Sequence, residues 1–252
     1  MDSRPHPIPI YAHRLGGAYG PESSYAALEQ TLSGHVDGLE CDVCLSADGE
    51  VFALHDPALE LCTDGEGWVH DAHAAEIARL RIRDRRGEPS DQTPMALREL
   101  LAVIPDEMPL QLDVKAYAEV ELARRTAERS CRALIEHGTP GRAEIISFFT
   151  PACAVAREHG LQGRLVMWAD YAPHALIAWA AAHGISGVSV EGFIFSPDLR
   201  RALTDAGLTA SIGSVNSRRQ LERVLPIGPD ILVSESPHEL AAELEAVRPR
   251  GA

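Results

Sequence analysis

The stretch Gly-Leu-Glu-Cys-Asp-Val at residues 38–43 sets two carboxylates into an otherwise apolar, strand-like segment. Side chains at positions i and i+2 of a β-strand point to the same face, so Glu40 and Asp42 project together and the apolar residues take the other face. Hard divalent cations prefer carboxylate oxygens, and histidines stand on both sides of the stretch in the sequence, at His13 and His55. The pattern therefore predicts a divalent-metal site with proton-transfer groups, and it favours phosphoester chemistry.

Similar short, β-prone runs recur along the chain, separated by segments with helical spacing. We expect strands at residues 8–13, 38–43, 110–115, 143–148, 164–169, 187–191, 208–215 and 230–234. We expect helices at residues 24–33, 117–137, 151–159, 172–183, 197–206, 217–224 and 237–247. Eight strands alternating with helices in 252 residues are typical of a (β/α)₈ TIM barrel. A doubly wound open sheet is the alternative, but no glycine-rich phosphate loop follows the first expected strand.

The organisation along the chain favours a single domain over residues 1–252, because no internal repeat or low-complexity linker divides it. Residues 55–108 are the one irregular stretch, and a small extra strand is expected just before them at residues 50–54. We interpret the irregular stretch as a long connection over the barrel mouth. No large cap insertion is expected between His55 and Asp113.

The bulk composition limits the kinds of partner. A net charge of −14 argues against nucleic acid or an anionic membrane surface. A local cation can still attract an anionic substrate. The longest apolar run, residues 175–182, is too short to span a bilayer, and the N-terminal residues have no apolar segment of the secretory type. We therefore expect a cytoplasmic protein without stable membrane insertion, and the oligomeric state stays open.

The five cysteines are odd in number and suggest no disulfide framework. The single C-x-x-C, Cys41 to Cys44, runs through the expected second strand. A redox pair of this spacing needs a helix N-terminus to lower the thiol pKa, which a strand does not supply. Cys41 is therefore predicted to be a small core residue.

In a TIM barrel the catalytic side chains lie at the C-terminal ends of the strands. Asp113 and Lys115 alternate with apolar residues late in the third expected strand, so both would face the barrel axis beside Glu40 and Asp42. Three inward carboxylates on adjacent strands would suit Mg²⁺ or Ca²⁺. Lys115, together with Arg14 after the first strand, would neutralise phosphate oxygens.

Several short motifs occur in a characteristic order. They are His13-Arg14-Leu15-Gly16-Gly17, Pro21-Glu22-Ser23-Ser24, Glu40-Cys41-Asp42-Val43, Asp48-Gly49 and His55-Asp56. This set closely resembles the glycerophosphodiester phosphodiesterase family, part of the phosphatidylinositol-phospholipase-C-like barrels. The resemblance runs from residue 8 to about residue 116 and continues more weakly, through Ser214-Val215-Asn216 and the stretch from Ser234 to Pro237.

The resemblance implies a site and a reaction. It implies three ligands for one divalent cation, Mg²⁺ or Ca²⁺: Glu40, Asp42 and Asp113. It implies an acid–base pair, His13 and His55, and two groups that hold the phosphoryl, Arg14 and Lys115. The implied reaction is hydrolysis of a small glycerophosphodiester-like substrate to an alcohol and a phosphomonoester. Which histidine is the acid and which the base stays open.

The chain also departs from the family pattern. Asp113 stands where most of the family has glutamate, and aspartate there is similar to the sphingomyelinase D branch, which releases cyclic phosphates. Leu15 adds bulk to the first motif, and Pro-Glu-Ser-Ser lacks the usual asparagine. A phosphotransferase or lyase that releases a cyclic phosphate, and a non-catalytic phosphodiester-binding protein, are therefore alternatives. The missing cap favours a small soluble diester over a bulky lipid.

Four further residues are candidates near the site. Glu22 either faces the site behind His13 or caps the first helix. Trp168 and Glu191, near the ends of the fifth and sixth expected strands, face the mouth, where the Trp168 ring either contacts substrate or packs within the barrel. Asp56 either orients His55 or begins the next loop.

Overall fold

The computed structural model describes residues 8–116, 119–167 and 173–247. Its strands are β1 (Ile10–Ala12), β2 (Gly38–Leu45), β3 (Val51–Ala53), β4 (Leu110–Val114), β5 (Ala143–Ser147), β6 (Gln162–Met167), β7 (Gly187–Glu191), β8 (Thr209–Gly213) and β9 (Ile231–Ser234). Its α-helices are α1 (Tyr25–Leu32), α2 (Leu59–Cys62), α3 (Ala74–Ile77), α4 (Leu97–Val103), α5 (Val120–Glu136), α6 (Thr150–Glu158), α7 (Pro173–Ala182), α8 (Pro197–Asp205), α9 (Arg218–Val224) and α10 (Pro237–Ala246). Short 3₁₀ helices are η1 (His13–Leu15), η2 (Val69–Asp71), η3 (Pro140–Arg142) and η4 (Leu225–Ile227).

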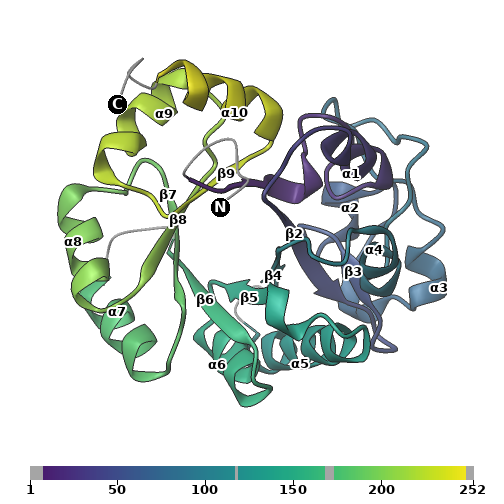
Figure 1. The fold of residues 1–252 in the computed structure, drawn as a ribbon. Helices are drawn as coiled ribbons and strands as arrows, with labels where there is room; N and C mark the ends of the chain where they lie inside the picture. Colours follow the sequence, from purple (N-terminus) through teal and green to yellow (C-terminus); the bar gives the residue numbers. More distant parts are fainter. Residues whose placement is uncertain (1–7, 117–118, 168–172, 248–252) are drawn as a thin grey trace.

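The strands form one closed barrel with helices around it (Figure 1). Among the described residues the sheet has nine strands in the order β1-β9-β8-β7-β6-β5-β4-β2-β3, and the additional pairing of β1 with β2 closes the ring. Only β3 runs antiparallel to its neighbour, so the other strands make the parallel barrel. The expected (β/α)₈ TIM barrel is therefore confirmed.

Strand alternation separates a core from a lumen. Leu39, Cys41 and Val43 are fully buried in the layer between β2 and the helices, so Cys41 is a core residue as predicted. All five cysteines are buried and free. The intervening carboxylates of β2 face the opposite side, toward the barrel axis.

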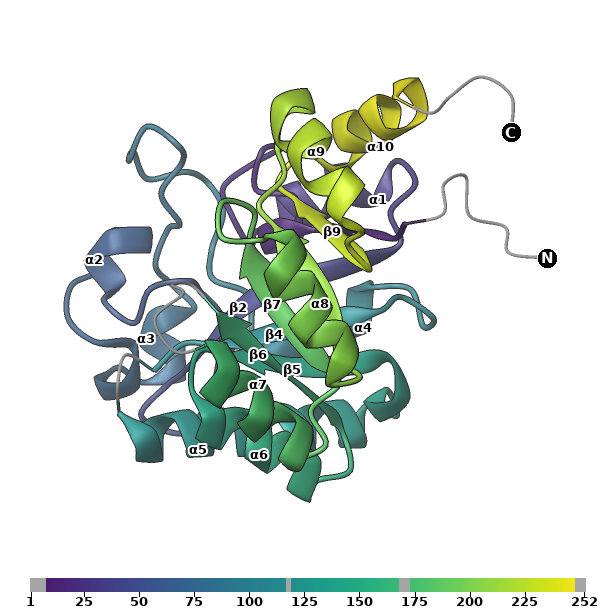
Figure 2. The same ribbon diagram turned by 90° about the vertical axis from the view of Figure 1, so that its left-hand side faces the viewer.

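The irregular stretch after β3 has the long connection that the sequence predicts. It carries α2, η2, α3 and α4, and a small apolar cluster that includes Phe52, Leu59 and Ile77 holds it against the barrel. Figure 2 shows α2 and α3 at the left edge of the molecule, away from α9 and α10 at the upper right. The connection also reaches the end of β9 through the ion pair between Arg85 and Glu235, and its small apolar cluster is no separate core of domain size.

A buried ion pair closes the barrel at the N-terminal ends of the strands. Arg164 Nε and Nη2 lie 2.9 and 3.1 Å from the two carboxylate oxygens of Glu144. The Arg164 Nη1 atom donates to Thr209 Oγ1 at 3.0 Å. A Cβ at Gly187 would lie 2.3 Å from Nη1, so the missing side chain leaves room for the guanidinium. Only 3% of the Arg164 side-chain surface is exposed, so the pair forms a polar floor for the barrel.

Replacing Arg164 with alanine is expected to lower the free energy of unfolding by about 3 kcal/mol, because the Glu144 carboxylate, only 20% exposed, would lose its cation. Urea unfolding at neutral pH measures the change. The control is Arg132→Ala, which breaks an exposed i,i+4 pair with Glu128 and is expected to cost at most about 0.5 kcal/mol. Equal losses for the two variants would contradict the structural role of the floor.

The same pair gives an acid dependence of stability. Burial by itself would raise the pKa of Glu144, but the charge of Arg164 and the hydrogen bonds from Arg164, Gln111 and Ser186 outweigh it and lower the pKa. A lowered folded-state pKa contributes stability that is complete above the unfolded pKa of about 4.3 and is lost as the pH falls through the folded value. The fall in stability between pH 5 and pH 3 is therefore expected to be smaller in Glu144→Gln than in the wild-type protein.

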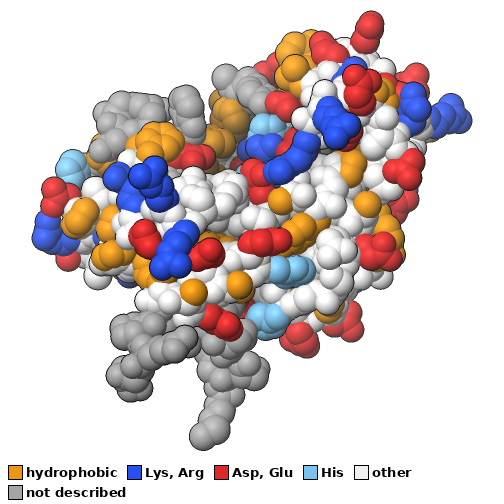
Figure 3. Space-filling model, turned by 90° about the horizontal axis from the view of Figure 1, so that it is seen from above, with side chains coloured by type: hydrophobic (Ala, Val, Ile, Leu, Met, Phe, Trp, Pro, Cys, Tyr) orange, Lys and Arg blue, Asp and Glu red, His pale blue; other side chains and the backbone are white. Residues whose placement is uncertain are grey.

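Two properties of the surface bear on partners. None of the helices within the described ranges is both long and apolar enough to cross a membrane. On the face seen in Figure 3, acidic, basic and apolar side chains are interspersed.

Candidate active site

Three carboxylates carried by β2 and β4 meet at the mouth of the barrel. Glu40, Asp42 and Asp113 each offer an oxygen, and the three oxygens lie within 4.8 Å of one another. Asp42 is the direct register partner of Asp113, and Glu40 lies two residues before Asp42 on the same face. All three residues are buried, at 3%, 1% and 6% exposure respectively. The structure thus brings together the three residues expected to bind metal.

The chemistry of this cluster fits a hard cation. Asp42 Oδ2 and Asp113 Oδ1 are buried and accept no hydrogen bond from the described residues. Buried carboxylate oxygens are costly unless a cation or donor faces them. Burial, together with the charge of Asp42, raises the pKa of Glu40, and burial likewise raises the pKa of Asp113. A divalent cation would offset this crowding of negative charge.

Two cationic side chains already face the cluster. Lys115 Nζ lies 2.7 Å from Asp113 Oδ2 and 3.0 Å from Asp42 Oδ1. Arg14 Nε lies 3.5 Å from Asp42 Oδ2. Burial by itself would lower the pKa of Lys115, but the two aspartates outweigh it and raise the pKa. Burial would raise the pKa of Asp42, yet Lys115, then His55 and Arg14, lower it. Asp42 is therefore the carboxylate that stays ionised beside these cations.

An unusual turn after β1 directs Arg14 to this place. Arg14 and Leu15 have positive φ angles of 51° and 58°, a conformation that non-glycine residues rarely adopt. The turn points the Arg14 backbone N–H at Glu40 Oε2, at 2.9 Å. Gly16 follows at φ 88°, where a Cβ would lie 1.9 Å from Thr31 Oγ1. The strained backbone thus ties the His13-Arg14 motif directly to the carboxylate cluster.

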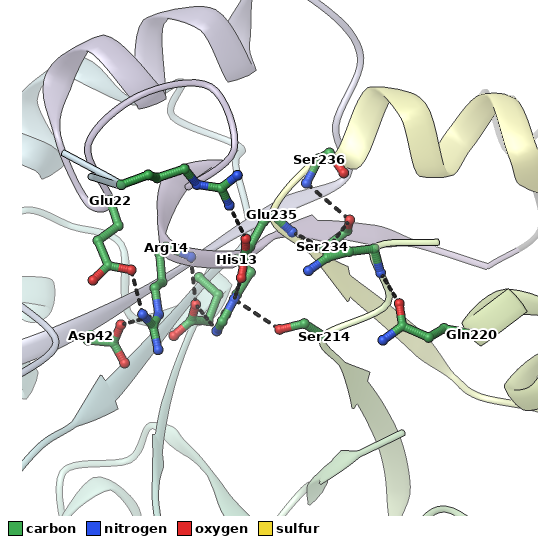
Figure 4. A network of polar contacts seen from close by, with 12 residues as sticks. His13, Arg14, Glu22, Asp42, Ser214, Gln220, Ser234, Glu235 and Ser236 are labelled. Carbon is green, nitrogen blue, oxygen red and sulfur yellow. Dashed lines mark hydrogen bonds and ion pairs between the residues drawn. The ribbon is translucent and has the colours of Figure 1, made fainter. Parts of the chain in front are cut away.

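Glu22 lies behind Arg14 and forms an ion pair with its guanidinium (Figure 4). The cap of α1 is Ser24, whose hydroxyl accepts from Ala27 N at 3.2 Å. Of the two interpretations of Glu22, the geometry therefore favours the one in which it faces the site.

His13 is held from one side and faces the carboxylates with the other. Its Nδ1 lies 3.1 Å from Ser214 Oγ and 3.8 Å from Glu235 Oε1, and its Nε2 lies 3.8 Å from Glu40 Oε2. Figure 4 shows the His13 ring beside Ser214 and Glu235, with Arg14 and Asp42 on its other side. Burial by itself would lower the pKa of His13, but Glu40 and then Glu235 outweigh it and raise the pKa.

His55 lies on the other side of the site and has a similar arrangement. Its Nδ1 lies 3.1 Å from Asp56 Oδ2. The backbone N–H of Leu54 donates to Asp42 O at 3.1 Å, which fixes the chain next to the cluster. Asp56 is therefore placed to orient His55, as one of the two interpretations expects.

These groups open into one cavity of about 820 Å³. Its polar lining includes His13, Arg14, Glu40, His55, Asp113, Lys115 and Glu191. Its apolar wall includes Phe148, Phe149, Met167 and Leu176. Burial raises the pKa of Glu191, which lies at the end of β7. Trp168 lies outside the described residues.

Two residues near His13 were missed as candidates from the sequence. Ser214 follows β8 and Glu235 follows β9, and both stretches belong to the weaker part of the resemblance. Glu235 is further held by Arg85 of the long connection and by Asn216 Oδ1, which accepts from its backbone N–H at 2.9 Å. Each of these two residues is a polar residue that directly follows an expected barrel strand, and this position in the sequence could have identified them as site candidates.

The fold and the clustered acidic, basic and histidine side chains at the strand ends are those of a TIM-barrel enzyme. Residues 13–239 match the model of the glycerophosphoryl diester phosphodiesterase family, and the chain belongs to that family. The family name describes hydrolases of phosphoric diesters.

Individual relatives with matching descriptions align with nearly the whole chain. A glycerophosphodiester phosphodiesterase of Caldanaerobacter subterraneus is 25% identical over 235 residues, which cover 92% of this chain and 95% of the relative. A phosphodiesterase of Oleispira antarctica, solved in complex with the product sn-glycerol-3-phosphate, superposes with a TM-score of 0.84 at 23% identity and covers 95% of this chain and 97% of its own. A putative glycerophosphoryl diester phosphodiesterase of Silicibacter pomeroyi also gives 0.84, at 20% identity, with 96% and 95% covered. The two solved structures are only 23% and 20% identical to this chain, so they support the assignment of its fold and nothing further.

Proposed function

We propose that this protein hydrolyses a small glycerophosphodiester-like substrate to an alcohol and a phosphomonoester, with the help of one bound Mg²⁺ or Ca²⁺. The observation that carries the proposal is the meeting of Glu40, Asp42 and Asp113 between two histidines in a single cavity. The glycerol 3-phosphate product bound to the Oleispira antarctica relative supports glycerol on one side of the phosphate.

The carboxylates would hold the cation, and the basic side chains would hold the phosphoryl group. A bound divalent cation supplies positive charge that reduces repulsion between the diester anion and its nucleophile. Arg14 and Lys115 line the same cavity and would hydrogen-bond the phosphoryl oxygens. Glu22 keeps the Arg14 guanidinium directed into the site, and Glu191 lies where it can contact the substrate alcohol.

The histidines would supply the proton transfers. Each Nδ1 faces a fixed oxygen atom, of Ser214 or Glu235 for His13 and of Asp56 for His55. Because Nδ1 of each ring faces a protein oxygen, Nε2 of each ring would be the atom that exchanges a proton with water or substrate. One histidine would take a proton from the attacking water, and the other would give one to the leaving alkoxide.

A cyclising reaction is the second candidate, because the third carboxylate is Asp113 where most of the family has glutamate. In that reaction a substrate hydroxyl attacks the phosphorus in place of water. Phosphorus NMR of a glycerophosphodiester incubated with the protein separates the two reactions. Direct appearance of a phosphomonoester supports hydrolysis, whereas a persistent cyclic ester would assign the site to a phosphotransferase or lyase. If a diester binds but neither product forms, the chain is a binding protein.

Glu235→Gln is expected to lower kcat by about tenfold to a hundredfold with little change in KM, because it weakens the hold on the His13 ring without touching the phosphoryl-binding groups. Glu235→Asp should recover part of the loss. Steady-state kinetics measure both constants. The control is Glu239→Gln, which removes a nearby surface carboxylate bonded to Tyr19 and is expected to change neither constant. A rise in KM alone would argue against positioning by Glu235.

A further inference from the structure

The carboxylate of Glu235 joins the active site to the long connection after β3. Its Oε1 lies 3.8 Å from His13 Nδ1, and its Oε2 forms an ion pair with Nη2 of Arg85. Glu235 lines the active-site cavity and also a smaller cavity of about 230 Å³, which Arg85 lines as well. Arg85 stands 150 positions before Glu235 in the chain, so the ion pair links segments that only the closed barrel brings together.

A tightly hydrogen-bonded turn carries Arg85. The Asp84 Oδ1 atom accepts from the backbone N–H groups of Arg86 and Glu88, at 2.8 and 3.0 Å. The backbone N–H of Asp84 donates to Glu88 O at 2.7 Å. Ile82, just before the turn, is only 1% exposed and anchors the segment in the interior. The turn therefore presents the Arg85 side chain to Glu235 from a defined position.

The backbone of Glu235 is held independently of Arg85. Its N–H donates to Asn216 Oδ1 at 2.9 Å, and its C=O accepts from the N–H of Ala18 at 3.1 Å. These bonds fix where the Glu235 side chain begins but leave its rotamers free. Within the described ranges, the carboxylate has ion pairs with His13 and Arg85. Without Arg85, the carboxylate, whose side chain is 28% exposed, would be free to turn into solvent and away from His13.

Two other roles for Arg85 fit the geometry less well. Arg85 is not among the residues that line the active-site cavity, so it is not placed to hold a phosphoryl group there. Its side chain is 60% exposed, and an ion pair at that exposure contributes little to the stability of a fold. The effect that remains is the one on the carboxylate that faces His13.

We propose that Arg85 is a positioning residue, which holds the Glu235 carboxylate against His13 and so keeps the His13 ring directed at the reacting groups. The inference rests on the proposed function and specifies how the long connection takes part in it. Residues 83–88 then contribute to the rate of the reaction through Glu235, and not through binding of the substrate.

Steady-state kinetics on the methyl ester of sn-glycerol 3-phosphate, with Mg²⁺ or Ca²⁺ present, test this role. Arg85→Ala is expected to lower kcat by about threefold to tenfold and to change KM by less than about twofold. Arg85→Lys keeps the positive charge and should recover most of the loss. The control is Arg86→Ala, which changes the neighbouring exposed arginine of the same turn and should leave both constants unchanged.

A double-mutant cycle shows whether Arg85 acts through Glu235. In a Glu235→Gln background, Arg85→Ala should lower kcat by less than about twofold, because the carboxylate that Arg85 holds is gone. NMR relaxation of ¹³C-labelled His13 gives a second readout that needs no turnover. The order parameter of the ring Cε1–H bond is expected to fall in Arg85→Ala and to stay at its wild-type value in Arg86→Ala.

The outcomes separate this inference from the proposed function. A wild-type kcat in Arg85→Ala, a rise in KM alone, or equal losses in the two backgrounds would overturn the positioning role and leave the phosphodiesterase intact. If the wild-type protein does not hydrolyse the ester, the proposed function is wrong, and the order parameter alone decides whether Arg85 holds the His13 ring. An order parameter that is unchanged in Arg85→Ala overturns the inference in either case.

Discussion

Replacing His13 or His55 with alanine is expected to lower kcat for an alkyl diester by about 10²–10⁴-fold, the usual contribution of a positioned acid or base. Both rings line the cavity that holds the carboxylate cluster, and both have Nδ1 anchored by neighbouring oxygens. KM is expected to change less, because Arg14 and Lys115 remain to hold the phosphoryl group. Steady-state kinetics on a glycerophosphodiester measure both effects.

The leaving group reveals which histidine is the acid. p-Nitrophenolate leaves without protonation, so the variant that lacks the general acid should recover most of its activity on a p-nitrophenyl diester, while the variant that lacks the base should not. His183→Ala is a suitable control because that ring is exposed and bonded to Trp179 O, outside the cavity. Wild-type kcat in both alanine variants would show that neither histidine takes part.

Asp113→Asn is expected to remove divalent-cation binding and to lower kcat/KM by about 10²–10³-fold. Asparagine has nearly the same shape, so the change removes a charge from the cluster without opening a cavity. Calorimetric titration with Mg²⁺ and with Ca²⁺ measures binding, and diester hydrolysis measures the effect on rate. Asp106→Asn, an exposed position before β4, is the matched control.

Asp113→Glu extends this experiment, because it restores the longer acid that most of the family carries. It should still bind the cation. Full cation affinity in Asp113→Asn, with normal activity, would exclude Asp113 as a ligand.

Local patterning was enough to predict the barrel and part of the site. The two-residue spacing of Glu40 and Asp42, repeated by Asp113 and Lys115, placed these side chains on the inner faces of neighbouring strands. Alternation predicted every barrel strand, with ends shifted by one or two residues. The first strand, for example, ends at Ala12 because the chain turns into the left-handed conformation at Arg14.

Contacts that depend on ring closure were not predictable in the same way. Glu235 lies more than two hundred positions from His13 and reaches it because β9 pairs with β1. Glu22 could not be assigned either, because a loop carboxylate before a helix is also a common cap, and only the position of Arg14 decides between the two roles.

The most direct test is hydrolysis of a glycerophosphodiester by protein freed of metal with a chelator and then titrated with Mg²⁺ or Ca²⁺. We expect no turnover in the chelated protein, recovery to full activity with one equivalent of the preferred cation, and no recovery in Glu40→Gln at the same concentration. Full activity in the chelated protein, or equal recovery in Glu40→Gln, would contradict a metal-assisted phosphodiesterase built on Glu40, Asp42 and Asp113.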